Sequence, residues 1–170
     1  MCKIKHALKN NYFHCRNFDH VPHGRGKGCG VFSLSSKSPP LSKQKVDKDL
    51  YQVMSFIDDQ FHPYQLVVVY ASSGCPFKEL ANDVEKLLQQ EMTTIIVGDF
   101  NFDRYETNAL SNFLQKKEFT QLVNWPTHRG GRTIDHCYVS KNSKIQVVRH
   151  SPYYSDHDAL CIEFEFFPWY

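Results

Sequence analysis

Apolar and polar positions along the middle of the chain predict a strand–helix–strand unit. QLVVVYASS (65–73) contains a continuous β-branched apolar run, which is typical of a strand covered on both faces. FKELANDVEKLLQQE (77–91) is amphipathic, and TTIIVGDFN (93–101) is a second buried strand. The helical stripe consists of Leu80, Val84, Leu87 and Leu88. A unit of this length predicts two parallel strands joined by a right-handed crossover.

The downstream part predicts a short helix and a series of short strands. TNALSNFLQKKEF (107–119) has Leu110, Phe113 and Leu114 at helical spacing. Turn signals, with PTHRGGR as a loop, separate the strands FTQLVNW (119–125), TIDHCYVS (133–140), KIQVVRH (144–150) and ALCIEFEF (159–166). The last strand alternates apolar positions with polar ones and includes Cys161, so it indicates an antiparallel sheet with one buried face. The whole pattern predicts a mixed α/β sandwich.

The upstream part has weaker signals. SSKSPPLSKQKVDK (35–48) is polar and contains proline, which favours a surface loop. HGRGKGCG (23–30) precedes the strand-like VFSL and has glycines beside Arg25 and Lys27. Because it fits neither GxGxxG nor a Walker loop, we interpret it as a flexible turn rather than a phosphate loop.

Composition and charge limit the number of domains and the kinds of partner that the protein can have. A chain of 170 residues, 41% hydrophobic, supports one domain with a real core. Residues 1–50 carry ten Lys/Arg against three Asp, and residues 51–170 carry ten against fifteen Asp/Glu, which together give the net charge of +2. A basic end beside an acidic body suits a polyanionic substrate at a carboxylate-lined site, although a solvated basic surface explains the charge equally well.

The cysteines indicate neither a disulfide framework nor a zinc site. The six are irregularly spaced without a CxxC pair, which favours a reducing compartment, and Cys137 and Cys161 have the setting of small core residues. The cluster of His14, Cys15, His20, His23 and Cys29 matches no tetrahedral zinc template. The N-terminus lacks a signal-peptide pattern, and LVVVYA is too short to span a membrane. We therefore expect an intracellular protein, nuclear or cytoplasmic, without membrane contact.

Polar residues gather where the predicted strands end. They are Tyr70, Asp99, Asn101, Asp135, His136, Asp156 and His157. Strand ends of layered α/β proteins converge on one rim, where ligands bind. Each residue taken alone has an ordinary structural interpretation, such as a turn aspartate or a core tyrosine. Asp135 is the exception, because a carboxylate in a half-buried strand needs a partner, and a histidine is the natural candidate.

The order GDFN, then IDHCYVS, then SDH resembles the endonuclease/exonuclease/phosphatase superfamily. Its members include abasic-site endonucleases, DNase I-like nucleases and the endonuclease domains of retrotransposons and Helitron-type elements. QLVNWPTHRGGRTIDHCYVS and YYSDHDAL are most similar to the mobile-element branch. The resemblance implies a DNase I-like four-layer α/β sandwich, in which two mixed β-sheets are flanked by helices. It spans residues 12–166 of a single domain, 1–170.

The resemblance also implies metal-assisted phosphodiester hydrolysis, with DNA as the expected partner and Mg²⁺ or Mn²⁺ as the cofactor. Asp99 would orient or deprotonate the attacking water, and Asn101 and Tyr70 would contact the phosphate. His157 would bind a non-bridging phosphate oxygen, and Asp135 would hold its ring and charge. Asp156 would help to bind the metal, directly or through water.

The sequence departs from the family in its N-terminal half. There the family has a strand carrying an Asn and a strand ending in a metal-binding Glu, whereas residues 1–78 contain no glutamate and the first is Glu79. Five aspartates are the upstream carboxylates, none at an expected strand end: Asp19, Asp47, Asp49, Asp58 and Asp59. We therefore expect an N-terminally truncated domain with weakened metal binding and slight or absent turnover. The cause is left open between a fragment, an incomplete gene model and a decayed element.

Two alternatives to the truncated endonuclease follow. In the first, the chain is a non-catalytic remnant that binds nucleic acid or protein, as the absent Glu suggests. In the second, it is a phosphatase that acts on a small phosphoester. The positive charge of residues 1–50 favours a long polyanion over the second alternative.

Overall fold

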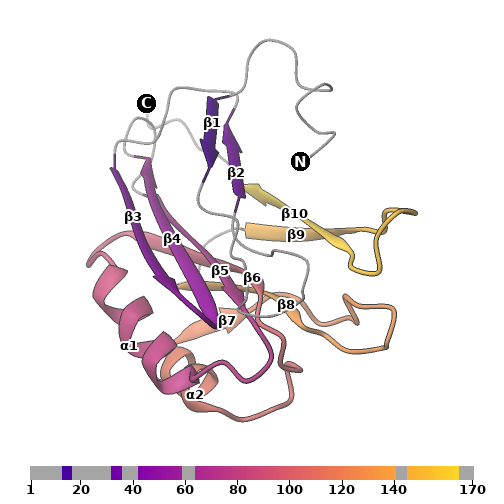
Figure 1. Cartoon of the computed structure of the whole chain (residues 1–170). Helices are drawn as coiled ribbons and strands as arrows, with labels where there is room; N and C mark the ends of the chain where they lie inside the picture. Colours follow the sequence, from indigo (N-terminus) through magenta and orange to yellow (C-terminus); the bar gives the residue numbers. More distant parts are fainter. Residues whose placement is uncertain (1–12, 17–31, 36–41, 59–63, 141–144, 165–170) are drawn as a thin grey trace.

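The computed structural model of the chain describes residues 13–16, 32–35, 42–58, 64–140 and 145–164. Figure 1 shows how the described helices and strands are arranged. In chain order they are β1 (Phe13–Arg16), β2 (Phe32–Ser35), β3 (Ser42–Lys48), β4 (Tyr51–Asp58), β5 (Tyr64–Ala71), α1 (Phe77–Leu87), β6 (Thr93–Asp99), α2 (Ala109–Lys116), β7 (Phe119–Gln121), β8 (Asp135–Ser140), β9 (Ile145–His150) and β10 (Ala159–Phe164).

A six-stranded mixed sheet organises the fold. Its strand order is β3-β4-β5-β6-β8-β7. β5 and β6 are parallel, as the sequence predicts, and α1 forms the connection between them. The other neighbouring pairs are antiparallel.

Both helices cover one face of this sheet (Figure 1). The predicted stripes are confirmed, because the inward side chains are Leu80, Val84 and Leu87 of α1 and Leu110 and Leu114 of α2. They pack against the alternate buried residues of β5, among them Val67 and Val69, in one hydrophobic core. α2 begins with a capping box, in which the Asn108 side chain accepts from the backbone of Leu110 and Ser111.

The antiparallel pair β9–β10 packs against the opposite face of the sheet. Ile95, Cys137 and Val139 of the sheet form a second core with Ile145 of β9, and Leu160 and Ile162 of β10 pack against it. The described part therefore contains the predicted two β layers, with its helices on the outer face of the larger sheet.

Two cysteines that the sequence places in the core differ in the structure. Cys137 in β8 is fully buried, as predicted. The same prediction for Cys161 is wrong, because this residue lies on the exposed face of β10. Leu160 and Ile162, on either side of it, face the core, as the alternation of the strand requires.

The prediction of a surface loop over 35–48 is wrong for its second half. Residues 42–48 form β3, the edge strand of the large sheet, paired only with β4. An edge strand is largely solvated and is often rich in lysine, so its composition resembles that of a loop. β4, whose residues 51–56 are buried on both faces, is a further strand that was not predicted from the sequence.

Some upstream predictions lie outside the described residues. They include the 23–30 turn and the side chains of the His14–Cys29 cluster. The strand expected at VFSL corresponds to β2, which pairs antiparallel with β1. Of the two helices in the described ranges, neither has the length of apolar sequence that a membrane span requires.

Candidate active site

The ends of three neighbouring strands bring the predicted residues together. In the antiparallel pair β6–β8, Asp99 lies directly opposite Asp135. In the parallel pair β5–β6, Tyr70 is the register partner of Asp99. Register partners point to the same face of a sheet, so these three side chains share the face on which β9 and β10 lie. The predicted convergence of strand ends on one rim is confirmed for them.

Gly98 allows β6 to carry Asp99 to this position. Its φ is +154°, and a Cβ built on it would lie 1.8 Å from the carbonyl oxygen of Val69 in β5. No other residue fits against that backbone without separating the two strands. The glycine before Asp99 is therefore a requirement of strand packing.

His157 lies beside Asp135 and is the histidine partner that was predicted for this carboxylate. Its Nδ1–H points at the carboxylate, 2.9 Å from Oδ2 and 3.1 Å from Oδ1. Asp99, Asp135 and His157 each place a nitrogen or oxygen atom within 4.8 Å of the others. The structure thus joins residues from β6, β8 and the loop before β10 in one cluster.

The turn 126–132 holds the His157 loop against the sheet. The Arg129 N–H donates to the Asp156 carbonyl at 2.9 Å, and the Asp158 N–H donates to the Thr127 carbonyl at 2.7 Å. The buried Thr127 hydroxyl also accepts from the backbone N–H groups of Ile134 and Asp135, at 3.1 and 3.0 Å. Thr127 therefore links the turn both to the start of β8 and to the His157 loop.

Burial and charge shift the pKa values of the cluster in useful directions. Burial, together with the nearby charge of Asp135, raises the pKa of Asp99 to about 6, although a hydrogen bond from the Asn101 N–H opposes this. Burial would lower the pKa of His157, but the hydrogen bond and charge of Asp135, with Asp99 and Asp156, raise it above its ordinary value. The cluster therefore stabilises a protonated histidine beside a carboxylate of increased basicity.

Asn101 stays at the rim in an unusual backbone conformation. Its φ is +53°, a left-handed value that asparagine tolerates better than most residues. Its N–H donates to Asp99 Oδ1 at 3.0 Å, and its side-chain amide donates to the Ala71 carbonyl at 2.7 Å. In this structure the side chain fixes the end of β5, and the predicted phosphate contact stays a prediction.

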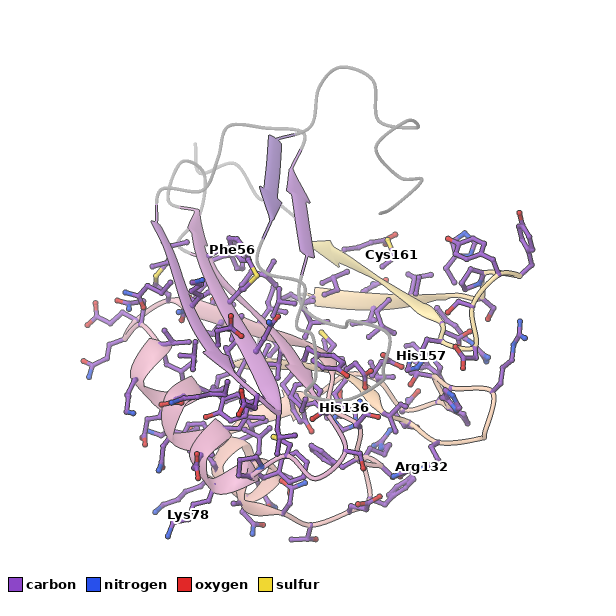
Figure 2. The ribbon with its side chains drawn as sticks, in the orientation of Figure 1. Phe56, Lys78, Arg132, His136, His157 and Cys161 are labelled. Carbon is purple, nitrogen blue, oxygen red and sulfur yellow. The ribbon has the colours of Figure 1, made fainter. Side chains whose placement is uncertain are left out.

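His136, next to Asp135, has a structural role. It is fully buried, its Nε2–H donates to the Thr133 carbonyl, and its Nδ1 accepts from the Tyr138 hydroxyl, both at 2.9 Å. Its ring stacks on Phe100 at 5.0 Å between centroids. Burial lowers the pKa of His136, so it is neutral in the core. Figure 2 shows the two histidines apart, His136 inside the molecule and His157 towards the loops.

The predicted metal ligand Asp156 lies on the other side of His157. Its side chain is 67% exposed and lies 3.5 Å from Nε2 of His128. His128, Asp156 and His157 form a second group with atoms within 4.8 Å, which shares only His157 with the group of Asp99 and Asp135. In the sequence His128 is only one residue of the predicted loop PTHRGGR. No strand pattern singles it out, because a contact between two loops brings it to the site.

The carboxylates fit a hard divalent cation. Asp99 and Asp135 are register partners with His157 close to both, and burial together with the charge of Asp135 raises the pKa of Asp99. Carboxylate oxygens are the ligands that Mg²⁺ and Mn²⁺ prefer. Within the described ranges neither metal-capable group includes a glutamate, and Asp47 and Asp49 belong to neither.

Comparisons with known proteins identify the family and the fold. The model of the endonuclease/exonuclease/phosphatase family matches residues 3–157. An endonuclease/exonuclease/phosphatase family protein from Leptotrichia buccalis is similar in structure, with a TM-score of 0.69 and 13% identity over 96% of this chain and 74% of that one. No curated protein sequence matches the chain significantly.

Two further solved structures share the fold. A mannosyl-6-phosphatase from Bacteroides thetaiotaomicron has a TM-score of 0.62 and 17% identity over 94% of this chain and 79% of that one. The Haemophilus ducreyi cytolethal distending toxin has a TM-score of 0.52 and 15% identity over 76% and 60%. The DNase I-like α/β fold expected from the motifs is thereby confirmed.

Proposed function

The chain belongs to the endonuclease/exonuclease/phosphatase family, and we propose that it hydrolyses phosphodiester bonds of nucleic acid with the help of a divalent metal ion. The family comprises hydrolytic enzymes that act on phosphoesters and typically use divalent metals. The observation that carries the proposal is the pair of His157 and Asp135, 2.9 Å apart, with Asp99 on the neighbouring strand.

Asp99 is the proposed base for the attacking water. A general base works best when its pKa lies near the operating pH, and the pKa of about 6 keeps Asp99 ionised yet basic near neutrality. The Asn101 N–H, 3.0 Å from Asp99 Oδ1, orients the carboxylate.

His157 is the proposed donor to the phosphate. Because its Nδ1–H is held by Asp135, its Nε2 is left to face a substrate, and as imidazolium it would donate to a non-bridging oxygen. Tyr70 and Asn101, on the adjacent strand and loop, are the proposed further phosphate contacts.

Asp156 is the proposed ligand of the metal ion, directly or through water. When bound, a hard divalent cation neutralises charge that develops on the phosphate oxygens. Because no glutamate of the described residues joins Asp156 in a metal-capable group, we expect weak metal binding and slow turnover.

DNA is the proposed substrate. The similarity of YYSDHDAL and the preceding motif to mobile-element endonucleases supports this, as does the excess of positive charge in residues 1–50. A long polyanion gains from such charge through counterion release, whereas a small phosphoester gains little.

Nicking of supercoiled plasmid by the purified chain tests the proposal. We expect nicking in Mg²⁺ and none in EDTA, and loss of nicking in Asp99→Ala and His157→Ala. His150→Ala and Asp49→Ala, which change an exposed histidine and an exposed aspartate outside the cluster, serve as matched controls and should nick normally. A folded wild-type chain that never nicks would refute the proposal and favour a non-catalytic binding role.

A phosphatase acting on a small phosphoester is the second candidate. It is favoured by the groove of about 480 Å³ beside His157, a size suited to one small ligand. Release of inorganic phosphate from a sugar phosphate, insensitive to salt and without plasmid nicking, would establish this candidate instead.

A further inference from the structure

A groove lies beside His157, between the turn 126–132 and the loop that joins β9 to β10. Both loops extend on the same side of the molecule in Figure 1, orange and yellow. The walls of the groove include His128, Arg129, Arg149 and Tyr153. Its volume of about 480 Å³ accommodates a ligand of nucleotide size rather than a duplex.

The walls of this groove are held in place before any ligand arrives. The turn and the loop form an antiparallel bridge between His128 and His157. The carboxylate of Asp158 accepts from Arg149 Nε at 2.7 Å and from the Ser151 hydroxyl. A ligand therefore finds a preformed site and does not have to order these loops.

His128 lines the groove with a fixed tautomer. The Gly130 N–H donates to Nδ1 of His128 at 2.9 Å, so Nδ1 is unprotonated and the neutral ring carries its proton on Nε2. Nε2 lies 3.5 Å from the Asp156 carboxylate at the groove. A protonated nitrogen cannot ligate a metal, so His128 acts here as a donor towards the carboxylate of Asp156. Gly130 permits this contact, because a Cβ there would lie 2.9 Å from Nδ1.

Tyr153 and Arg129 line the groove, and Tyr154 is the exposed neighbour of Tyr153. Tyr153 and Tyr154 are 93% and 80% exposed, and their rings meet edge to face at 5.3 Å. Arg129 donates to the Tyr153 carbonyl at 3.4 Å, and no carboxylate among the described residues forms an ion pair with it. Solvent-exposed aromatic rings beside an unneutralised cation are typical of sites that bind unpaired bases and their phosphates.

We propose that this groove binds one unpaired nucleotide of the substrate strand, next to the phosphodiester held by His157. Its phosphate contacts the guanidinium of Arg129, and its base stacks on Tyr153, whose ring meets that of Tyr154. This inference rests on the proposed function and narrows its substrate to single-stranded or locally melted nucleic acid. In an intact duplex the base faces are already stacked and cannot reach the tyrosines.

Binding measured in EDTA, where no cleavage occurs, tests the inference. The probes are a fluorescein-labelled single-stranded DNA, the same sequence as a duplex, and a base-free sugar–phosphate strand of equal length, each followed by anisotropy. Wild type should bind the single strand more tightly than the other two. The double variant Tyr153→Ala/Tyr154→Ala should weaken binding of the single strand about 5- to 150-fold, as the loss of one base–aromatic stack implies.

Tyr105→Ala is the matched control, because Tyr105 is 81% exposed but does not line the groove. It should bind as wild type. Arg129→Gln should lower the slope of log Kd against log salt by about one, the value for one lost phosphate contact. Unchanged binding by the double tyrosine variant, or tighter binding of the duplex by wild type, would overturn the inference.

The plasmid assay separates this inference from the proposed function. Tyrosine-dependent binding without nicking means that hydrolysis fails while the groove still selects unpaired nucleotides. If the plasmid is nicked but the double tyrosine variant binds single-stranded DNA as tightly as wild type, the proposed hydrolysis is supported and the inference about the groove is wrong.

Discussion

Asp99→Asn is expected to make the protein more stable while it abolishes hydrolysis. The substitution keeps the shape of the side chain, and its amide oxygen can still accept the hydrogen bond from the Asn101 N–H. It removes a negative charge that lies buried opposite Asp135. A residue that serves catalysis at a cost in stability should show this combination of effects.

The magnitude follows from the pKa of Asp99, raised from 3.8 to about 6 by burial and by the charge of Asp135. The shift corresponds to about 3 kcal/mol of destabilisation by the ionised form. Because Asp99 is half-buried, solvent screening reduces this to about 1–2 kcal/mol. The pKa of Asp99 is higher in the folded protein than in the unfolded one. The destabilisation is therefore absent at a pH below the unfolded-state pKa, and it grows with pH until the pH exceeds the folded-state pKa. About a third of it should therefore remain at pH 4.5.

Urea unfolding of both proteins at pH 7.5 and pH 4.5 measures this difference. We expect Asp99→Asn to be more stable than wild type at pH 7.5, with a gap that narrows as the pH falls. Added Mg²⁺ should stabilise wild type more than the variant, because the ion compensates a charge that only wild type has. A variant that is equally or less stable at pH 7.5, with no dependence on pH, would refute the reasoning about the buried charge.

Three further substitutions test other parts of the site. Asp135→Asn should leave the fold intact but lower the pKa of His157, read by NMR titration, and reduce kcat about 10- to 100-fold; an unchanged pKa would contradict the assigned pairing. Gly98→Ala should destabilise the protein by about 2–4 kcal/mol in urea unfolding, because its Cβ meets the Val69 carbonyl; a loss below about 1 kcal/mol would contradict the packing argument. Thr127→Val should cost about 2–4 kcal/mol by leaving two backbone N–H groups unpaired, whereas Thr127→Ser should stay close to wild type; equal losses in both would show that the hydroxyl is not the cause.

The amino-acid sequence by itself determined the part of the fold that rests on local periodicity. The β5–α1–β6 unit could be predicted because its apolar runs are long and have distinct periods. The need of Asp135 for a histidine followed from the cost of a half-buried carboxylate, and His157 is that partner. Strand order then places Asp99 opposite Asp135, because polar residues at strand ends converge when the strands pair.

Only the tertiary structure decided features that depend on neighbours distant in sequence. β3 has the composition of a loop, and its strand pairing comes from β4. Cys161 has the setting of a core residue in the sequence, yet it lies on the exposed face of β10, because the core contacts the other face. His128 joins the site through backbone contacts between two loops, which no periodic pattern encodes. The physical reason is the same in each case, because periodicity reports one local face of an element, whereas burial and loop contacts are set by what packs against it.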